Sequence, residues 1–146
     1  MSQTDTELRL ERRYDAPADR VFEAWTNPEV LRRWWAAGPD WECPQAEVDL
    51  RVGGRYRLAM RNPEGETHVV VGEYTAISPP DHLAYTWAWE GGDAAETLVS
   101  VDFRPDGDGT TVVLTHTGFP DERAREMHAH GWTGCLDNLG ARVLKA

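Results

Sequence analysis

Residues 126–132 read E-M-H-A-H-G-W and place His128 and His130 one residue apart beside Trp132. Two neighbouring histidines suggest a metal site or an acid/base pair, because imidazole ligates metals and titrates near neutral pH. At about 100° per residue, however, a helix turns His130 about 200° away from His128. Chelation from one helix requires i,i+4 spacing instead. We therefore predict no metal site and no cofactor here, with His128 facing inward and His130 facing solvent.

The helix that carries these histidines is predicted to begin at residues 120–122 and to run almost to Ala146. Its apolar stripe contains His128, Trp132, Cys135, Leu136, Leu139 and Val143. The helix also holds Gly131, Gly134 and Gly140, and a glycine costs roughly 1 kcal/mol relative to alanine in a helix interior. Two explanations stay open: close packing against a sheet, or space left for a cavity beside the stripe.

The elements before this helix must supply the surface that it packs against. Alternating apolar and charged residues predict a strand over residues 8–12. Pro17 and Pro28 then each lie at the start of a predicted short helix, where proline is favoured. The apolar residues of these two helices are Val21, Phe22, Trp25, Leu31, Trp34 and Trp35.

Between residues 42 and 118, strand patterns alternate with turn-forming residues. The first strand runs into a predicted bend at Gly53-Gly54, and the others are predicted near residues 55–61, 67–77, 82–90, 96–104 and 110–117. Their hairpin spacing indicates an antiparallel meander, and only the C-terminal helix is large enough to cover its apolar face. The predicted fold is α+β: a curved antiparallel sheet of six to seven strands wrapped round a long C-terminal helix, with two short helices after the first strand.

Length and composition favour a single domain over residues 1–146, with residues 1–6 as a flexible N-terminus. The net charge of −10 argues against binding to nucleic acid or to an anionic membrane surface. The start of the chain lacks the features of a signal peptide, and no apolar stretch approaches the ~20 residues of a membrane span. Cys43 and Cys135 form no metal or disulfide cluster, so we expect a cytoplasmic protein with reduced thiols.

The inward faces of the predicted sheet and helix would line an apolar cavity. The candidate ligand-binding residues are Trp34, Trp35, Tyr56, Leu58, Met60, Tyr85, Trp87, Val99, Val101, Leu114, His116, His128 and Trp132. Among these, His116 and His128 are the polar groups, and Trp34 or Trp35 is a candidate to close the mouth. The alternative is that these side chains simply fill the core.

Several motifs occur in the order and spacing of a known family. They are Ala16-Pro17-x-x-x-Val21-Phe22-x-Ala24-Trp25-Thr26-x-Pro28-x-x-Leu31-x-x-Trp34-Trp35, Asp49-x-Arg51-x-Gly53-Gly54-x-Tyr56, Gly72-x-Tyr74-x-x-Ile77-x-Pro79-Pro80-x-x-Leu83, Thr115-His116-x-Gly118-Phe119 and His128-x-x-Gly131-Trp132-x-x-x-Leu136-x-x-Leu139. Over roughly residues 8–140 the chain resembles the activator of heat-shock ATPase homologue family, in the superfamily of START domains, birch-pollen-type allergens and polyketide cyclases. The resemblance implies a helix-grip fold with an internal, largely apolar cavity between sheet and helix.

Three functions stay open at this point. The leading interpretation is a protein that binds an apolar or aromatic small molecule in the cavity. The second is a cyclase- or hydrolase-type enzyme, with His116 or His128 as acid/base and Tyr56 or Tyr85 orienting a carbonyl, but no catalytic motif supports it and we assign no catalytic residue. The third is a protein-interaction module, either co-chaperone-like or a homodimer, anchored by Trp41 and the Trp34-Trp35 pair.

Overall fold

The computed structural model describes residues 7–91 and 96–144, so the predicted flexible segment 1–6 lies outside the described residues. The elements follow in the order β1 (Glu7–Tyr14), α1 (Ala18–Thr26), α2 (Pro28–Trp34), β2 (Glu42–Val48), β3 (Arg55–Arg61), β4 (Thr67–Ser78), β5 (His82–Trp89), β6 (Thr97–Asp106), β7 (Gly109–Thr117), α3 (Glu122–Leu139) and the π-helical turn η2 (Gly140–Leu144). This order of strands and helices confirms the prediction from sequence.

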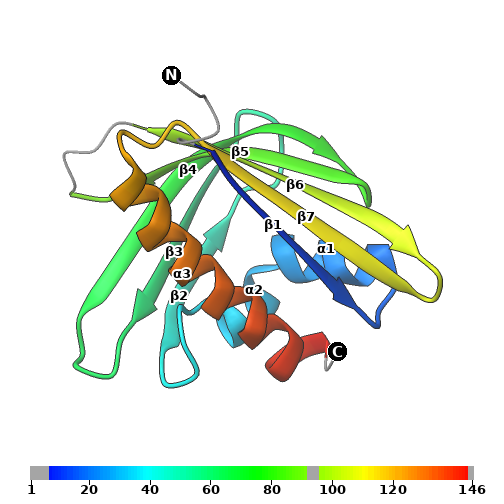
Figure 1. Ribbon diagram of the computed structural model, residues 1–146, viewed down its shortest axis with the longest axis horizontal. Helices are drawn as coiled ribbons and strands as arrows, with labels where there is room; N and C mark the ends of the chain where they lie inside the picture. The colour runs from blue at the N-terminus through cyan, green and yellow to red at the C-terminus, as the bar shows by residue number, and fades with distance from the viewer. Residues whose placement is uncertain (1–6, 92–95, 145–146) are drawn as a thin grey trace.

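The described strands form one antiparallel sheet of seven strands in the order β1-β7-β6-β5-β4-β3-β2. The sheet is curved, and α3 runs across its inner face (Figure 1). The short helices α1 and α2 lie near the C-terminal half of α3 (Figure 1). The predicted α+β helix-grip architecture is therefore confirmed. None of the helices within residues 7–91 and 96–144 is both long and apolar enough to cross a membrane.

The helix ends follow from local sequence chemistry. The side chain of Asn27 caps α2 by accepting from the backbone N–H of Glu29, with Pro28 in the first turn. Asp121 caps α3 in the same way, through Ala124 N–H at 2.9 Å. At the other end, the α-helical hydrogen bonds of α3 stop at Leu139, and residues 140–144 continue as a π-helical turn. The predicted start of the long helix is therefore confirmed, and its end differs in helix type.

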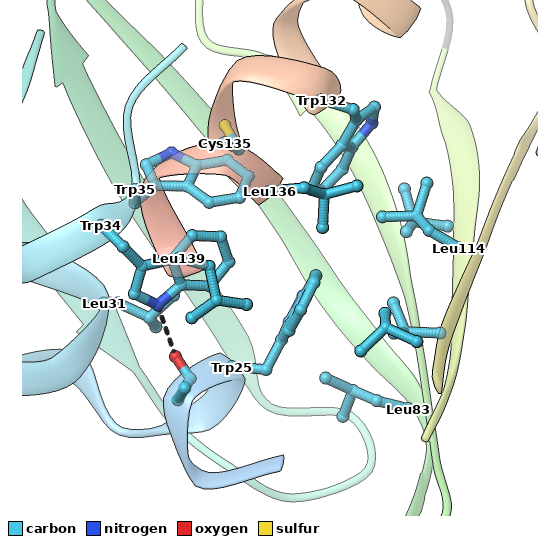
Figure 2. Close-up of a cluster of buried hydrophobic side chains, with 14 of the residues drawn as sticks. Trp25, Leu31, Trp34, Trp35, Leu83, Leu114, Trp132, Cys135, Leu136 and Leu139 are labelled. Atoms are coloured by element: carbon cyan, nitrogen blue, oxygen red, sulfur yellow. Dashed lines mark hydrogen bonds between the residues drawn. The ribbon is translucent and has the colours of Figure 1, made fainter. Parts of the chain in front are cut away.

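The core lies between the sheet and α3. Along β5, β6 and β7, every second residue is buried, namely Leu83, Tyr85, Trp87, Val99, Val101, Phe103, Val112, Leu114 and His116, and on β7 Val113 is buried as well. Figure 2 shows the centre of this cluster, with Trp35, Cys135 and Trp132 at one end and Trp25 and Leu83 at the other. The Trp34 indole donates to the carbonyl of Ala24 at 2.9 Å, which ties α2 to α1 (Figure 2).

Candidate ligand-binding site

A pocket of about 360 Å³ lies between the middle of α3, the loop that follows α2 and one end of strands β3–β5. Its lining consists of Trp35, Ala37, Trp41, Met60, His68, Trp87, Trp89, Met127, His128, Gly131, Trp132 and Cys135. We call this site the tryptophan pocket. Its volume falls in the range of about 300–1,000 Å³ that is typical of small-molecule sites.

The inner walls of the tryptophan pocket are indole rings in edge-to-face and tilted contact. The ring centroids of Trp35 and Trp132 lie 5.3 Å apart, and those of Trp87 and Trp132 lie 5.0 Å apart. Trp89 extends this wall from Trp87 at 5.4 Å. Aromatic pairs at such distances hold one another in fixed orientations. The pocket therefore presents a preformed aromatic surface to anything that enters it.

The glycines of α3 have two different roles. A side chain built at Gly131 would meet no atom within 4 Å, and Gly131 lines the tryptophan pocket. A Cβ at Gly134, in contrast, would collide with the backbone carbonyl of Ala37. Both explanations considered from the sequence are thus present in one helix: Gly131 leaves space beside the stripe, and Gly134 permits close packing.

The loop that forms one wall of the pocket is held in place by residues that follow one another at one-turn intervals along α3 and η2. Beyond the contact at Gly134, the amide of Asn138 donates to the carbonyls of Ala36 at 3.0 Å and Gly38 at 2.9 Å. One turn further, Arg142 donates to the carbonyls of Pro39 and Trp41. These contacts position Ala37 and Trp41, which come from a segment without regular secondary structure.

The mouth of the pocket is formed by residues that remain in contact with solvent. Met127 is 65% exposed, His68 is exposed and Trp41 is half-buried. Trp41 and His68 stack with ring centroids 6.2 Å apart. Trp34 and Trp35 are instead 0% and 1% exposed, so the structure corrects two expectations. Neither residue closes the mouth, and neither is available to anchor a protein interface, because both are covered by the helices and the sheet.

His116 is a fully buried, neutral histidine. Its Nδ1 accepts a hydrogen bond from Trp132 Nε1 at 3.1 Å, because an indole N–H can only donate. The proton of the ring must then reside on Nε2, which donates to Thr97 Oγ1 at 2.7 Å, and Thr97 in turn donates to the carbonyl of Trp87. Burial, together with the nearby His128, lowers the pKa of His116 to about 3.

His128 is also a neutral histidine, but its ring proton is on Nδ1 rather than on Nε2. Its Nε2 accepts from Trp89 Nε1 at 3.1 Å, so Nδ1 carries the proton and donates to the carbonyl of Ala124 at 2.8 Å. Burial lowers the pKa of His128, and the hydrogen bond to Ala124 opposes that shift. His128 is half-buried in the pocket wall and His130 is exposed, as the helical phase predicts. Both inward histidines therefore use both ring nitrogens to hold neighbouring residues, which leaves neither one free as a general base.

The cysteine in the lining has no nucleophilic character. Cys135 is buried, and burial raises the pKa of its thiol to about 12. It is therefore a neutral thiol near pH 7, and only the thiolate is a strong nucleophile. The lining offers a defined shape and an aromatic surface.

The predicted site residues fall into three groups. The tryptophan pocket contains Trp35, Met60, Trp87, His128 and Trp132. A second space of about 10 Å³, no larger than one water molecule, is lined by Tyr56, Leu58 and Tyr85 together with Trp35 and Trp87. The remaining candidates, Trp34, Val99, Val101, Leu114 and His116, line neither space and lie in the packed core.

Seven residues of the lining are not among those predicted from the sequence. Sequence periodicity could have identified two of them as inward-facing. Trp89 continues the alternation of Tyr85 and Trp87, and Cys135 lies on the apolar stripe of α3. Ala37, Trp41, His68, Met127 and Gly131 complete the lining. Ala37, Trp41 and His68 carry no periodic signal, because they lie in a loop or at an exposed strand end, where hydrophobic periodicity is uninformative.

The seven-stranded sheet that grips a C-terminal helix, with a pocket at one end of the interface, defines a helix-grip α+β protein. Residues 15–143 match the family described as activator of Hsp90 ATPase homolog 1-like protein, and the chain belongs to this family. A comparison with curated protein sequences gives no match.

Solved structures of the same fold are similar over nearly the whole chain. A protein from Chromobacterium violaceum is 27% identical with a TM-score of 0.85, over 97% of this chain and 99% of that one. The AHSA1 protein from Silicibacter pomeroyi is 30% identical with a TM-score of 0.82, over 92% and 95% of the two chains. An HSP90 activator from Plasmodium falciparum is 25% identical with a TM-score of 0.73, over 93% and 94%.

Proposed function

We propose that this chain is a cytoplasmic binding protein that takes up a small apolar or aromatic molecule in the tryptophan pocket. The proposal is supported by the size of the pocket and by the five tryptophans in its lining. Flat aromatic surfaces stack well on indole rings and gain from the removal of apolar area from water. The absence of Lys, Arg, Asp and Glu from the lining residues that the structure describes favours an uncharged guest.

The observation that carries the proposal is Gly131. A glycine in a helix interior costs roughly 1 kcal/mol relative to alanine. At Gly131 no neighbouring atom would obstruct a side chain, so packing gives no reason for that cost. Space for a guest gives a reason for the cost, because Gly131 lines the tryptophan pocket.

Naphthalene is a suitable probe because it is flat, apolar and uncharged. It should bind to the wild-type protein and raise its midpoint of thermal unfolding in proportion to the occupancy of the site. In Gly131→Leu, the new side chain occupies the pocket, and the affinity for naphthalene should fall by about tenfold or more. Gly131→Ala is the matched variant, in which a single methyl group should give an intermediate affinity. Equal affinities in all three proteins would refute a ligand site at this position.

A second candidate function is activation of an HSP90-type ATPase. The name of the family and the Plasmodium relative support it. Gly131→Leu tells whether such an activity depends on the pocket, because this substitution is designed to fill it. Stimulation of HSP90 ATP turnover that is unchanged in Gly131→Leu would therefore favour this function, whereas no stimulation by the wild-type protein would exclude it for the HSP90 that is tested.

A further inference from the structure

One hydrogen bond joins two residues of the pocket lining, His128 and Trp89. Trp89 Nε1 donates to His128 Nε2 at 3.1 Å, and both residues line the tryptophan pocket. The other ring nitrogen, Nδ1, carries the proton and donates to the carbonyl of Ala124 at 2.8 Å. An indole N–H can only donate, and a protonated imidazole has no acceptor. The hydrogen bond between His128 and Trp89 therefore exists only while His128 is neutral.

Protonation of His128 sets two donors against each other. The second proton goes to Nε2, the atom that accepts from the indole N–H of Trp89. Both nitrogens of the cation are donors, so a flip of the imidazole ring leaves the conflict in place. One of the two side chains must then move, and either movement changes the wall of the tryptophan pocket.

Hydration gives a second reason why a guest and a proton compete. His128 is half-buried, so part of its surface meets solvent, whereas His116 is 0% exposed. Because His128 lines the pocket, a guest there removes water from the side chain. Loss of hydration disfavours the charged form of histidine. Guest binding should therefore favour the neutral form of His128.

The groups that face His128 from other elements carry no negative charge. The rings of Trp87 and Trp89 face it from β5, with centroids 6.1 Å away in each case, and Phe119 faces it from the segment before α3 at 4.9 Å. His116 faces it from β7 at 5.2 Å, and its pKa of about 3 keeps this second imidazole neutral.

The charged neighbour of His128 on α3 itself is Arg125, which lies one turn earlier and pairs with Glu122 at 3.2 Å. Burial lowers the pKa of His128, and the opposing effect comes from the carbonyl of Ala124 rather than from a carboxylate of the described residues. No described anion therefore compensates the charge that protonation would bring into the pocket wall.

We propose that a guest and a proton compete for the tryptophan pocket, so that the pocket holds its guest at neutral pH and releases it when His128 is protonated. The inference rests on the proposed function and adds the regulation of that site. His128 couples the two events, and Trp89 is the wall residue whose hydrogen bond protonation breaks. By linkage, a guest that binds the neutral form expels a proton wherever His128 is protonated in the free protein.

Naphthalene is the probe for this coupling because it has no ionisable group, so every proton released on binding comes from the protein. Isothermal titration calorimetry in two buffers with different enthalpies of ionisation counts these protons. We expect no release at pH 8 and up to one proton per naphthalene near and below the pKa of His128, which burial lowers from its ordinary value of 6.5. Below that pKa, the affinity should fall by up to about tenfold per pH unit.

Three histidine variants assign the proton to its source. In His128→Gln the release should disappear at every pH, whatever the affinity of the variant. His130→Gln is the matched control, because His130 is exposed and faces away from the pocket on the same helix, and it should release protons as the wild type does. His68→Gln should do so as well, because His68 lines the pocket but is exposed. Release that persists in His128→Gln and disappears in His68→Gln would overturn the assignment to His128.

Proton NMR of the wild-type protein tests the same coupling without any variant. In the free protein, the indole N–H resonance of Trp89 should move upfield with the same midpoint as the imidazole resonances of His128, because the hydrogen bond between them is lost. With saturating naphthalene, the midpoint of His128 should move to lower pH. An unchanged midpoint, or a His128 that stays neutral until the protein unfolds, would overturn the coupling.

The outcomes separate this inference from the proposed function. Naphthalene binding with the same affinity on both sides of the His128 midpoint, and without proton release, would overturn the coupling and leave the proposed function intact. No binding of naphthalene at pH 8 would overturn the proposed function and, with it, the coupling.

Discussion

Trp132 donates a hydrogen bond from its indole Nε1 to Nδ1 of His116 across 3.1 Å, and this one contact fixes which nitrogen of a buried imidazole carries the proton. The proton on Nε2 in turn orients Thr97, whose hydroxyl donates to the carbonyl of Trp87. His116 thereby links two tryptophans of the pocket wall, one from α3 and one from β5. It acts as a positioning residue for the site and does not itself line the pocket.

The neutral state of His116 predicts a definite response to acid. The ordinary pKa of 6.5 applies to the unfolded chain, whereas burial lowers the pKa in the folded protein to about 3. Between these values the unfolded state binds more protons, so the free energy of unfolding should fall as the pH falls, by up to about 1.4 kcal/mol per pH unit from this group. The stabilising contribution is complete above pH 6.5 and is lost progressively toward pH 3.

Proton NMR of the imidazole Cε1–H resonances tests this directly, because each histidine reports its own titration. We expect the His116 resonance to stay in its neutral position from pH 8 to pH 4.5. The exposed His130 in the same spectrum serves as the internal control. A midpoint for His116 near its ordinary value would contradict the assigned hydrogen-bond chain.

The contrast between Gly131 and Gly134 predicts opposite effects of the same substitution on stability. Gly131→Ala should raise the free energy of unfolding by roughly 1 kcal/mol, because the methyl group enters open space and alanine favours the helix. Gly134→Ala should lower it by about 1–3 kcal/mol, because the added Cβ forces α3 away from the backbone of Ala37. Urea unfolding of the two variants measures both effects, and a loss of stability in Gly131→Ala would show that the space beside this residue is filled.

The hydrogen bonds of the Asn138 side chain should stabilise the loop that forms one wall of the pocket. Asn138→Ala removes the donor to the carbonyls of Ala36 and Gly38 and should cost about 1–3 kcal/mol of unfolding free energy. Asn138→Asp keeps the shape of the side chain but replaces the donor with an acceptor facing two carbonyl oxygens, so it should cost more. Hydrogen exchange of the backbone N–H groups of residues 36–41 should accelerate in both variants. Equal stability of Asn138→Asp and the wild type would show that these hydrogen bonds do not fix the loop.

The sequence was sufficient for the fold because its signals are local. Alternation along β5 and β6 and the stripe on α3 specify which side of each element is buried, and that determines how sheet and helix meet. The same signals do not specify position along the interface. Val99 and Leu114 therefore share the inward direction with Trp87, yet they lie in the packed core while Trp87 lines the pocket.

The tryptophan pocket depends on tertiary contacts that no local pattern encodes. Whether a glycine of α3 adjoins space or backbone is determined by the path of residues 36–38, which is set by Gly134 and Asn138 from the far end of the chain. The state of His116 likewise depends on Trp132 and Thr97, which contact it from another element and another strand. Sequence periodicity predicts that these side chains face inward, but it does not predict which of them contact or hydrogen-bond one another.

The most direct test of the central claim is an isotope-filtered NOE spectrum of the labelled protein with unlabelled naphthalene. Binding in the tryptophan pocket predicts intermolecular NOEs from naphthalene to the indole protons of Trp35, Trp87 and Trp132 and to the methyl group of Met60. These NOEs should disappear in Gly131→Leu at the same ligand concentration. NOEs confined to residues outside the pocket, or an identical set of NOEs in Gly131→Leu, would contradict the assignment of this pocket as the binding site.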